Sequence, residues 1–223
     1  MGTEIKTGRR MTRIVKKPDE RREEIIKAAR ELFHTKDYDK TTMQDIMDAL
    51  NIAKGTIYHY FSSKQELLEA VVEDMVDEEY RKKEALMKSG RVKGLPAMEK
   101  LRVLITESGT GPETERILDT LHHPENYEMH TKQLGRYITK LAPLWAAVFA
   151  EGREQGVFRV EHPLECAEFI LAGAQFMIDV GFYPWSESQI NRRLRALPRL
   201  LESQLGVPAG TFDFINEKQE GKK

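Results

Sequence analysis

Apolar residues recur every three or four positions along most of this 223-residue chain, which is the spacing of one face of an α-helix. The first such stretch runs from about Asp19 to Thr35, and a shorter one runs from Thr42 to Leu50. Thr42 and Asp45 stand three residues apart at the start of the second stretch, an approximate capping box. Two helices joined by a short link are therefore predicted.

The stretch from Asn51 to Lys64 combines apolar anchors with side chains that donate hydrogen bonds. Ile57 and Phe61, four residues apart, would face the core after a tight turn at residues 51–53. The donors lie off that face: Lys54, Thr56, Tyr58 and His59. Such donors suit the phosphates and base edges of DNA. A helix-turn-helix with a DNA-reading second helix is predicted; the alternative, a hairpin that merely packs, does not need these donors.

These residues resemble the DNA-binding domain of the TetR-family transcriptional regulators. The matching positions are I-I-K-A-A-R-E-L-F (25–33), Tyr38, Thr41, Thr42, Ile46, K-G-T-I-Y-H-Y-F (54–61) and S-K-Q-E-L-L (63–68). Asp37 and Asn51 stand where the family commonly has Gly, and both residue types tolerate left-handed backbone. Ala53 stands where Ser is common, so the recognition helix lacks a capping hydroxyl.

The DNA-binding residues are predicted from the donor pattern and from this resemblance. The resemblance implies that Gln44 reaches a base edge. They are Thr42, Gln44, Lys54, Thr56, Tyr58, His59 and Lys64. Residues 1–22 add eight Lys or Arg against three acids, although the net charge of the chain is only −1. We interpret residues 1–18 as a basic mobile arm that would add phosphate contacts, with an inert solvated tail as the alternative.

The remainder of the chain also has helical spacing. Ser63 and Glu66 form a capping box that opens a helix leading away from the DNA-binding domain. Further helices are predicted over about 96–106, 112–122, 126–155, 163–181 and 187–205, with Pro143 kinking or splitting the longest. The predicted fold is all-α: an N-terminal three-helix helix-turn-helix domain (19–64) and a helical C-terminal domain for ligand binding and dimerisation (65–223).

The TetR resemblance implies that the C-terminal domain binds a small effector and dimerises. Candidate effector residues are Met98, Tyr137, Trp145, Phe149 and Phe176, with ordinary core as the alternative. The helices over 163–181 and 187–205 could form a four-helix bundle with a second copy, unless they complete the core of a monomer. The predicted interface residues are Ile170, Ala174, Ile178, Ile190, Leu194, Leu197 and Leu201.

Catalytic and metal-binding patterns are weak. The chain has no H-E-x-x-H, CxxC or G-x-S-x-G motif, and Cys166 is the single cysteine, so no intrachain disulfide forms. One cluster could attract a metal, namely Asp119, His122, His123 and His130. The alternatives are a polar helix end before Pro124 or a ligand pocket. We expect no enzyme activity, no cofactor and no bound metal.

Together these features predict a dimeric transcriptional repressor that binds a palindromic double-stranded DNA operator and is released by a small hydrophobic or amphipathic effector. No apolar run reaches membrane-spanning length, and we expect a cytoplasmic protein with no membrane partner. One alternative is a helical DNA-binding protein without an effector, such as a nucleoid or division factor. Another is a helical protein-interaction module whose helix-turn-helix is vestigial.

Overall fold

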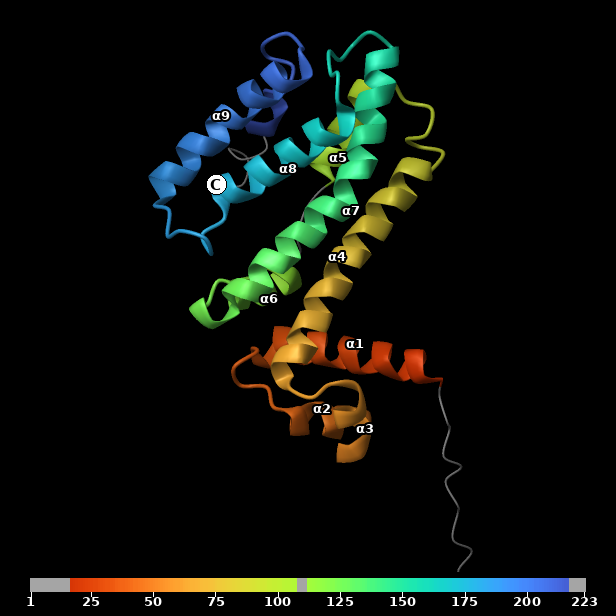
Figure 1. Cartoon of the computed structure of the whole chain (residues 1–223), viewed down its shortest axis with the longest axis vertical. Coiled ribbons are helices and arrows are strands. Elements are labelled where there is room, and N and C mark those ends of the chain that lie inside the picture. Colours follow the sequence, from red (N-terminus) through yellow and green to blue (C-terminus); the bar gives the residue numbers. More distant parts are fainter. Residues whose placement is uncertain (1–16, 108–111, 217–223) are drawn as a thin grey trace, which may run out of the picture.

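The computed structural model describes residues 17–107 and 112–216, and the regular secondary structure in these ranges is helical (Figure 1). The all-α prediction is therefore confirmed. The basic arm predicted for residues 1–18 lies almost entirely outside the described residues. None of the described helices has the length and apolar character needed to cross a membrane.

The N-terminal domain begins with α1 (Pro18–Lys36), which lies across α2 (Met43–Leu50) and α3 (Lys54–Tyr60). Thr42 and Asp45 complete the predicted capping box, since each side chain pairs with the other residue's backbone N–H. Asp37 and Asn51, which occupy the expected glycine positions, both have positive φ (68° and 50°). Asn51, with ψ of 50°, is in the left-handed helical region that Asn tolerates without glycine. Asp37, with ψ of 152°, lies outside that region, in a conformation that favours glycine.

The long helix α4 (Lys64–Lys88) runs from the N-terminal domain into the rest of the protein (Figure 1). Ser63 caps it by accepting a hydrogen bond from the Glu66 N–H, but the Glu66 carboxylate accepts from the N–H of Ser62 instead of that of Ser63, so only half of the predicted capping box is made. Leu67 and Leu68 at its start are fully buried in the same core as Ile57 and Phe61 of the helix-turn-helix. The first core therefore continues beyond residue 64 into α4.

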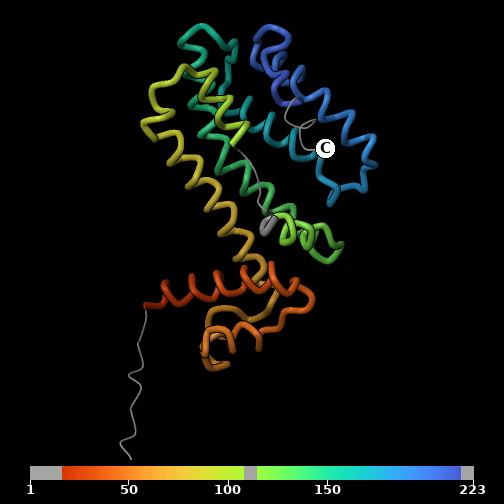
Figure 2. Tube along the Cα trace, turned by 180° about the vertical axis from the view of Figure 1, so that it is seen from behind, coloured from red at the N-terminus to blue at the C-terminus, as the bar shows by residue number. Residues whose placement is uncertain are grey.

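Two later helices complete this first core. They are α6 (Pro112–Leu121) and, after the short 3-10 helix η1 (Pro124–Asn126), the start of α7 (Tyr127–Glu154). Ile117, Leu121 and Met129 are buried against residues of α1 and α4. Seen from behind, α6 lies beside the junction of α1 and α4 (Figure 2). Segments that follow the helix-turn-helix by about 50 residues or more thus share its core.

A second core joins α7 to α5 (Ala97–Thr106), α8 (Pro163–Ile178) and α9 (Glu187–Leu205). Phe149 of α7 and Phe212, after α9, are fully buried in it. Helix α7 is continuous from Tyr127 to Glu154, so Pro143 does not split it. Pro143 is exposed, and the main-chain groups that a proline leaves without a helical hydrogen bond can there be solvated.

Candidate DNA-binding surface and regulatory sites

The predicted donors of α3 lie on its outer side. Ile57 and Phe61 anchor the helix with exposed fractions of 0% and 1%, whereas Lys54, Tyr58 and His59 are exposed. The Lys54 ammonium lies 5.6 Å from the centre of the Tyr58 ring, so the two side chains share one patch. Thr56 is half-buried beside them. This patch, together with α2, has the arrangement of a surface that could enter a DNA groove.

The start of α2 is held rigidly by Thr42 and Asp45. The Thr42 hydroxyl is occupied in the capping box, while the Asp45 carboxylate also accepts from the Lys36 ammonium at 2.7 Å. Hydrogen bonds from Lys36 and Thr42 hold the pKa of Asp45 at about 2. Gln44 is exposed, and its Nε2 donates to Oδ1 of Asp48 at 2.7 Å. Gln44 is therefore presented outward in an ordered position.

Lys64 differs from the other predicted DNA contacts, because its ammonium is engaged within the protein. It donates to the main-chain oxygen of Tyr38 at 2.8 Å and lies 4.2 Å from the centre of the Tyr38 ring. Desolvation by burial lowers the pKa of Lys64. The side chain joins the start of α4 to the loop between α1 and α2. A contact between Lys64 and a phosphate stays a prediction that competes with this internal role.

Four of the five predicted effector residues come together in the second core. Met98, Tyr137, Trp145 and Phe149 belong to it, and burial raises the pKa of the Tyr137 hydroxyl. The indole Nε1 of Trp145 is buried without a hydrogen-bond partner among the residues that the structure describes. Phe176 lies apart from them and is 56% exposed.

A separate surface cavity lies between α4 and α7. Its lining is mostly charged or polar: Glu69, Val72, Glu73, Met129, Lys132, Gln133 and Arg136. Arg136 donates to Glu73 at 2.8 Å and pairs with Asp77 at 3.4 Å, which ties α7 to α4. None of the predicted effector residues lines this cavity.

The predicted interface on α8 and α9 needs a correction at two positions. Ile170 and Leu201 are only 7% and 6% exposed because they point into the core of their own chain. The remaining predicted interface residues are half-buried: Ala174, Ile178, Ile190, Leu194 and Leu197. Large apolar side chains that were not predicted to form the interface are exposed instead: Phe169, Phe176 and Leu200. The rotation of each helix about its own axis determines which side chains face the core. The sequence of a largely apolar helix does not specify this rotation.

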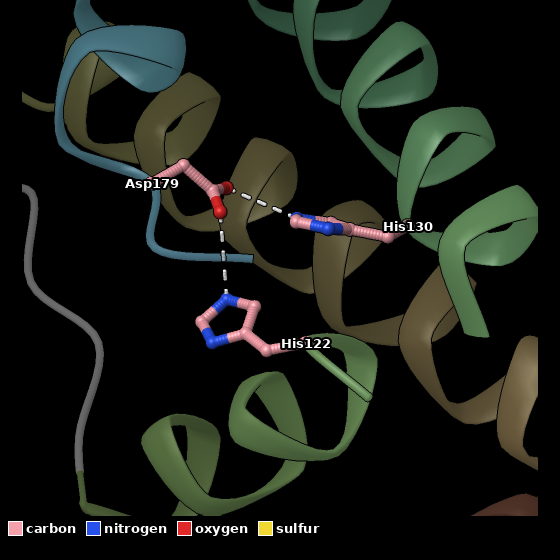
Figure 3. Close-up of side chains that lie close together, drawn as sticks. All are labelled: His122, His130 and Asp179. Atoms are coloured by element: carbon pink, nitrogen blue, oxygen red, sulfur yellow. Dashed lines mark hydrogen bonds and ion pairs between the residues drawn. The ribbon is translucent and has the colours of Figure 1, made fainter. Parts of the chain in front are cut away.

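The end of α8 meets the segment that joins α6 to α7. Asp179, the residue after α8, accepts a hydrogen bond at Oδ2 from Nε2 of His130, the two atoms being 3.0 Å apart. Nε2 of His122 lies 3.6 Å from the other carboxylate oxygen of Asp179 (Figure 3). Of the cluster expected from sequence, Asp119 flanks His122 at 4.0 Å, whereas His123 is exposed and faces Glu125.

This three-residue group, which we call the His122–His130–Asp179 junction, is partly shielded from water. Burial lowers the pKa of His122. Burial alone would raise the pKa of the Asp179 carboxyl, but the hydrogen bond and charge of His130 bring it below its usual value. Asp179 was not predicted from the sequence, because no local pattern relates this position to two histidines about 50 residues earlier.

Comparison with known proteins matches the two domains separately. The sequence model described as "Bacterial regulatory proteins, tetR family" matches residues 25–71, and that of the "Tetracyclin repressor-like, C-terminal domain" matches residues 113–200. The chain is 26% identical over 151 residues to the HTH-type transcriptional repressor KstR2 of Rhodococcus jostii, covering 66% of this chain and 72% of that protein.

Solved structures show the same fold. A TetR-family regulator from Pectobacterium atrosepticum superposes with a TM-score of 0.60 at 22% identity, covering 86% of this chain and all of that one. RolR, solved in complex with resorcinol, superposes with a TM-score of 0.56 at 21% identity, covering 88% of this chain and 93% of the other.

Proposed function

Because the chain is a member of the TetR family of transcriptional regulators, we propose that it represses its target genes by binding a palindromic operator as a homodimer until a small effector releases it. The chain is a DNA-binding transcriptional regulator. Regulators of this family are typically not enzymes, and the role that we propose for this chain is accordingly binding rather than catalysis.

The observation that carries this proposal is the outer patch of α2 and α3. Gln44, Lys54, Tyr58 and His59 are exposed on two helices whose opposite sides are buried. Side chains that donate hydrogen bonds in this position can pair with acceptors on bases and phosphates. We assign base contacts to Gln44 and Lys54. Thr42, Thr56, Tyr58 and His59 complete the proposed DNA-binding residues, whereas Lys64, whose ammonium donates to the Tyr38 oxygen, is assigned a structural role.

The proposed dimer interface uses the outer faces of α8 and α9. Phe169 and Phe176 are 64% and 56% exposed and lie two helical turns apart on α8, while Leu200 of α9 is 47% exposed. Exposed large apolar side chains on two neighbouring helices favour burial against another protein surface. A second copy would cover them through a four-helix bundle that keeps Ala174, Ile178, Ile190, Leu194 and Leu197 near its seam. Ile170 and Leu201 then support this interface from beneath.

The proposed effector site lies around Met98, Tyr137, Trp145 and Phe149. Their surfaces are largely apolar, and the buried indole N–H of Trp145 has no hydrogen-bond partner among the described residues. Such a site suits a hydrophobic or amphipathic molecule with one acceptor for this N–H. Phe176 is withdrawn from this set because it faces outward. RolR, which shares the fold, was solved in complex with resorcinol, a small amphipathic molecule.

The experiment that tests this function is selection of bound duplexes from genomic DNA of the source organism, followed by a gel shift at several salt concentrations. We expect an inverted repeat whose half-sites are separated by about one helical turn, bound by two chains. Specific binding should weaken steeply as salt rises, since phosphate contacts release counterions. Absence of any sequence preference would contradict the proposal.

A further inference from the structure

Three side chains with metal-ligating atoms meet where α6, α7 and α8 come together. His122 directly follows α6, His130 lies in the first turn of α7, and Asp179 follows α8 (Figure 3). One ligand atom from each lies within 4.8 Å of those of the other two. Both imidazoles present Nε2 to the same carboxylate, one to each oxygen, at 3.6 and 3.0 Å.

These separations are close to those of a metal-ligand set. Metal–ligand bonds of about 2.0–2.2 Å in a tetrahedral site place neighbouring ligand atoms roughly 3.3–3.6 Å apart. The two distances to Asp179, each to a different carboxylate oxygen, lie near this range, whereas the limit of 4.8 Å on the separations between single ligand atoms is wider. The side chain of His130 is 4% exposed and that of His122 is 25% exposed, so His122 has the freedom to swing toward the ion and close the remaining gap.

A purely structural role explains only part of this arrangement. Of the three side chains, His130 and Asp179 share one hydrogen bond, and His122 lies beyond hydrogen-bond range of the carboxylate. Nδ1 of His130 is buried and has no hydrogen-bond partner in the described part of the chain. One carboxylate oxygen satisfies one histidine, yet the fold also brings a second imidazole to the other oxygen, which already accepts a hydrogen bond from the Gly181 N–H.

Neighbouring groups lie around these side chains. The Asp119 carboxylate lies 4.0 Å from Nδ1 of His122, on the side of the ring opposite Asp179 and beyond hydrogen-bond range. A small movement of His122 would let it donate to Asp119, as the second nitrogen of a ligating histidine commonly donates to a carboxylate. On the other side, the Phe182 ring stacks on His130 with a centroid distance of 4.8 Å, and the Gly181 N–H donates to Oδ1 of Asp179 at 2.8 Å.

We propose that the His122–His130–Asp179 junction binds one divalent transition-metal ion such as Zn²⁺, with water or an effector atom in the remaining coordination position. Two imidazoles and one carboxylate suit Zn²⁺, Co²⁺ or Ni²⁺ better than Mg²⁺ or Ca²⁺, which prefer sets of oxygen ligands. The bound ion joins the end of α6 to α7 and α8.

Helix α6 connects the His122–His130–Asp179 junction to the DNA-binding domain. Ile117 and Leu121 of α6 are buried in the first core, and Nη1 of Arg116 donates to the main-chain oxygen of His34 in α1 at 2.9 Å. An ion that favours one position of α6 therefore shifts the position of α1, and through it the helix-turn-helix. This part of the inference rests on the proposed function, and linkage requires metal and operator to change each other's affinity by the same factor.

The metal site is tested on untagged, full-length protein freed of metal with a chelator and titrated with Co²⁺, whose visible absorption reports its ligands. We expect one Co²⁺ per chain, displaced by Zn²⁺. Asp179→Asn and His122→Gln should each weaken Co²⁺ by more than about 100-fold, because loss of a ligand exceeds the usual effect of an outer-shell change. Circular dichroism of the metal-free variants checks that both fold.

His123→Gln is the matched control, because His123 is the exposed neighbour of His122 and faces away toward Glu125. It should bind Co²⁺ like the unaltered protein. Absence of a Co²⁺ spectrum in the unaltered protein would overturn the site. Equal losses in the His122 and His123 variants would also overturn it, since they would indicate adventitious surface binding.

The coupling is tested by measuring operator affinity with and without Zn²⁺. The coupling is supported if Zn²⁺ changes the operator affinity by at least about fivefold, the lower end of typical allosteric coupling, and if Asp179→Asn shows no such change. An identical affinity under both conditions overturns the coupling. Failure to bind any DNA would instead contradict the proposed function. The Co²⁺ titration uses no DNA, so it tests the metal site even if the proposed function is wrong.

Discussion

The guanidinium of Arg116 reaches from α6 to the main-chain oxygen of His34 in the last turn of α1, and donates to it from Nη1 at 2.9 Å. The same guanidinium lies 3.8 Å from the carboxylate of Asp37, the residue that ends α1. Because His122 follows the other end of α6, one short segment connects the junction with the domain that binds DNA.

Replacing Arg116 by Ala should weaken the response of DNA binding to metal more than DNA binding itself. The change removes the link to His34 but no predicted DNA contact. We expect metal-free operator affinity to change little and the Zn²⁺-induced change to shrink severalfold, measured by fluorescence anisotropy. The neighbouring exposed Glu115→Ala is the control. An undiminished Zn²⁺ effect in Arg116→Ala would show that coupling takes another route.

Mutations should distinguish residues of the DNA-binding surface that read bases from residues that stabilise the fold. Gln44→Ala or Lys54→Ala should relax the preference at particular base pairs by roughly 1–3 kcal/mol while stability is retained. Lys64→Ala should lower the unfolding free energy by about 1 kcal/mol, because it removes the hydrogen bond to the Tyr38 oxygen. Urea unfolding and binding to a panel of operator variants measure both. A fully stable Lys64→Ala with a salt slope lowered by about one unit would return Lys64 to the phosphate role.

The exposed apolar face of α8 and α9 should be required for dimerisation. Phe169→Glu combined with Leu200→Glu places charges on side chains that are 64% and 47% exposed in one chain, so the fold should survive. Sedimentation should show a monomer, and specific operator binding should be lost. Leu201→Glu is the contrasting variant, because its buried charge should unfold the chain. A folded Phe169/Leu200 variant that remains dimeric would place the interface elsewhere.

Stability at low pH should depend on Glu78, which joins α4 to Arg30 of α1. Pairing with Lys82 and Arg30 lowers the pKa of Glu78 from 4.5 to about 2. The unfolded state therefore binds more protons between these two values, and the stabilisation present above pH 4.5 is lost as the pH falls toward 2.

The test compares urea unfolding at neutral pH and at about pH 3 for the unaltered chain and Glu78→Gln. The variant should be less stable at neutral pH, and the difference between the two proteins should shrink at the lower pH. Glu23→Gln, at an exposed glutamate of α1, should follow the unaltered chain. If the difference in unfolding free energy between Glu78→Gln and the unaltered chain did not depend on pH, the charge of the Glu78 carboxylate would not be the source of the stabilisation.

Gly181 should be required for the geometry of the junction. A Cβ atom at this position would lie 2.3 Å from Cδ2 of His122 and 2.7 Å from Cε1 of His130. Gly181→Ala should therefore displace the more exposed His122 and weaken Co²⁺ binding about tenfold or more, an effect of the size seen for outer-shell changes. Gly135→Ala on α7, where nothing lies within 4 Å, is the control. Unchanged Co²⁺ affinity in Gly181→Ala would argue against the proposed ligand arrangement.

Local signals were sufficient for the helices and for the helix-turn-helix. The helix predicted over Glu187–Leu205 has those bounds in the structure, and the caps at Thr42 and Ser63 are both made. Caps, turns and apolar periodicity act over three or four residues, so the sequence contains them directly. The exposure of Lys54, Tyr58 and His59 followed from the same periodicity.

Contacts between helices distant in sequence were decided only by the tertiary structure. The approach of Asp179 to His122 and His130, the capture of Lys64 by the Tyr38 oxygen, and the inward direction of Ile170 and Leu201 all depend on how whole helices rotate and cross. An amphipathic pattern states which residues avoid water, but an apolar helix such as α8 fits several rotations nearly equally well. Packing against α7 and α9 selects one of them, and that choice determines which side chains meet and which remain for a partner.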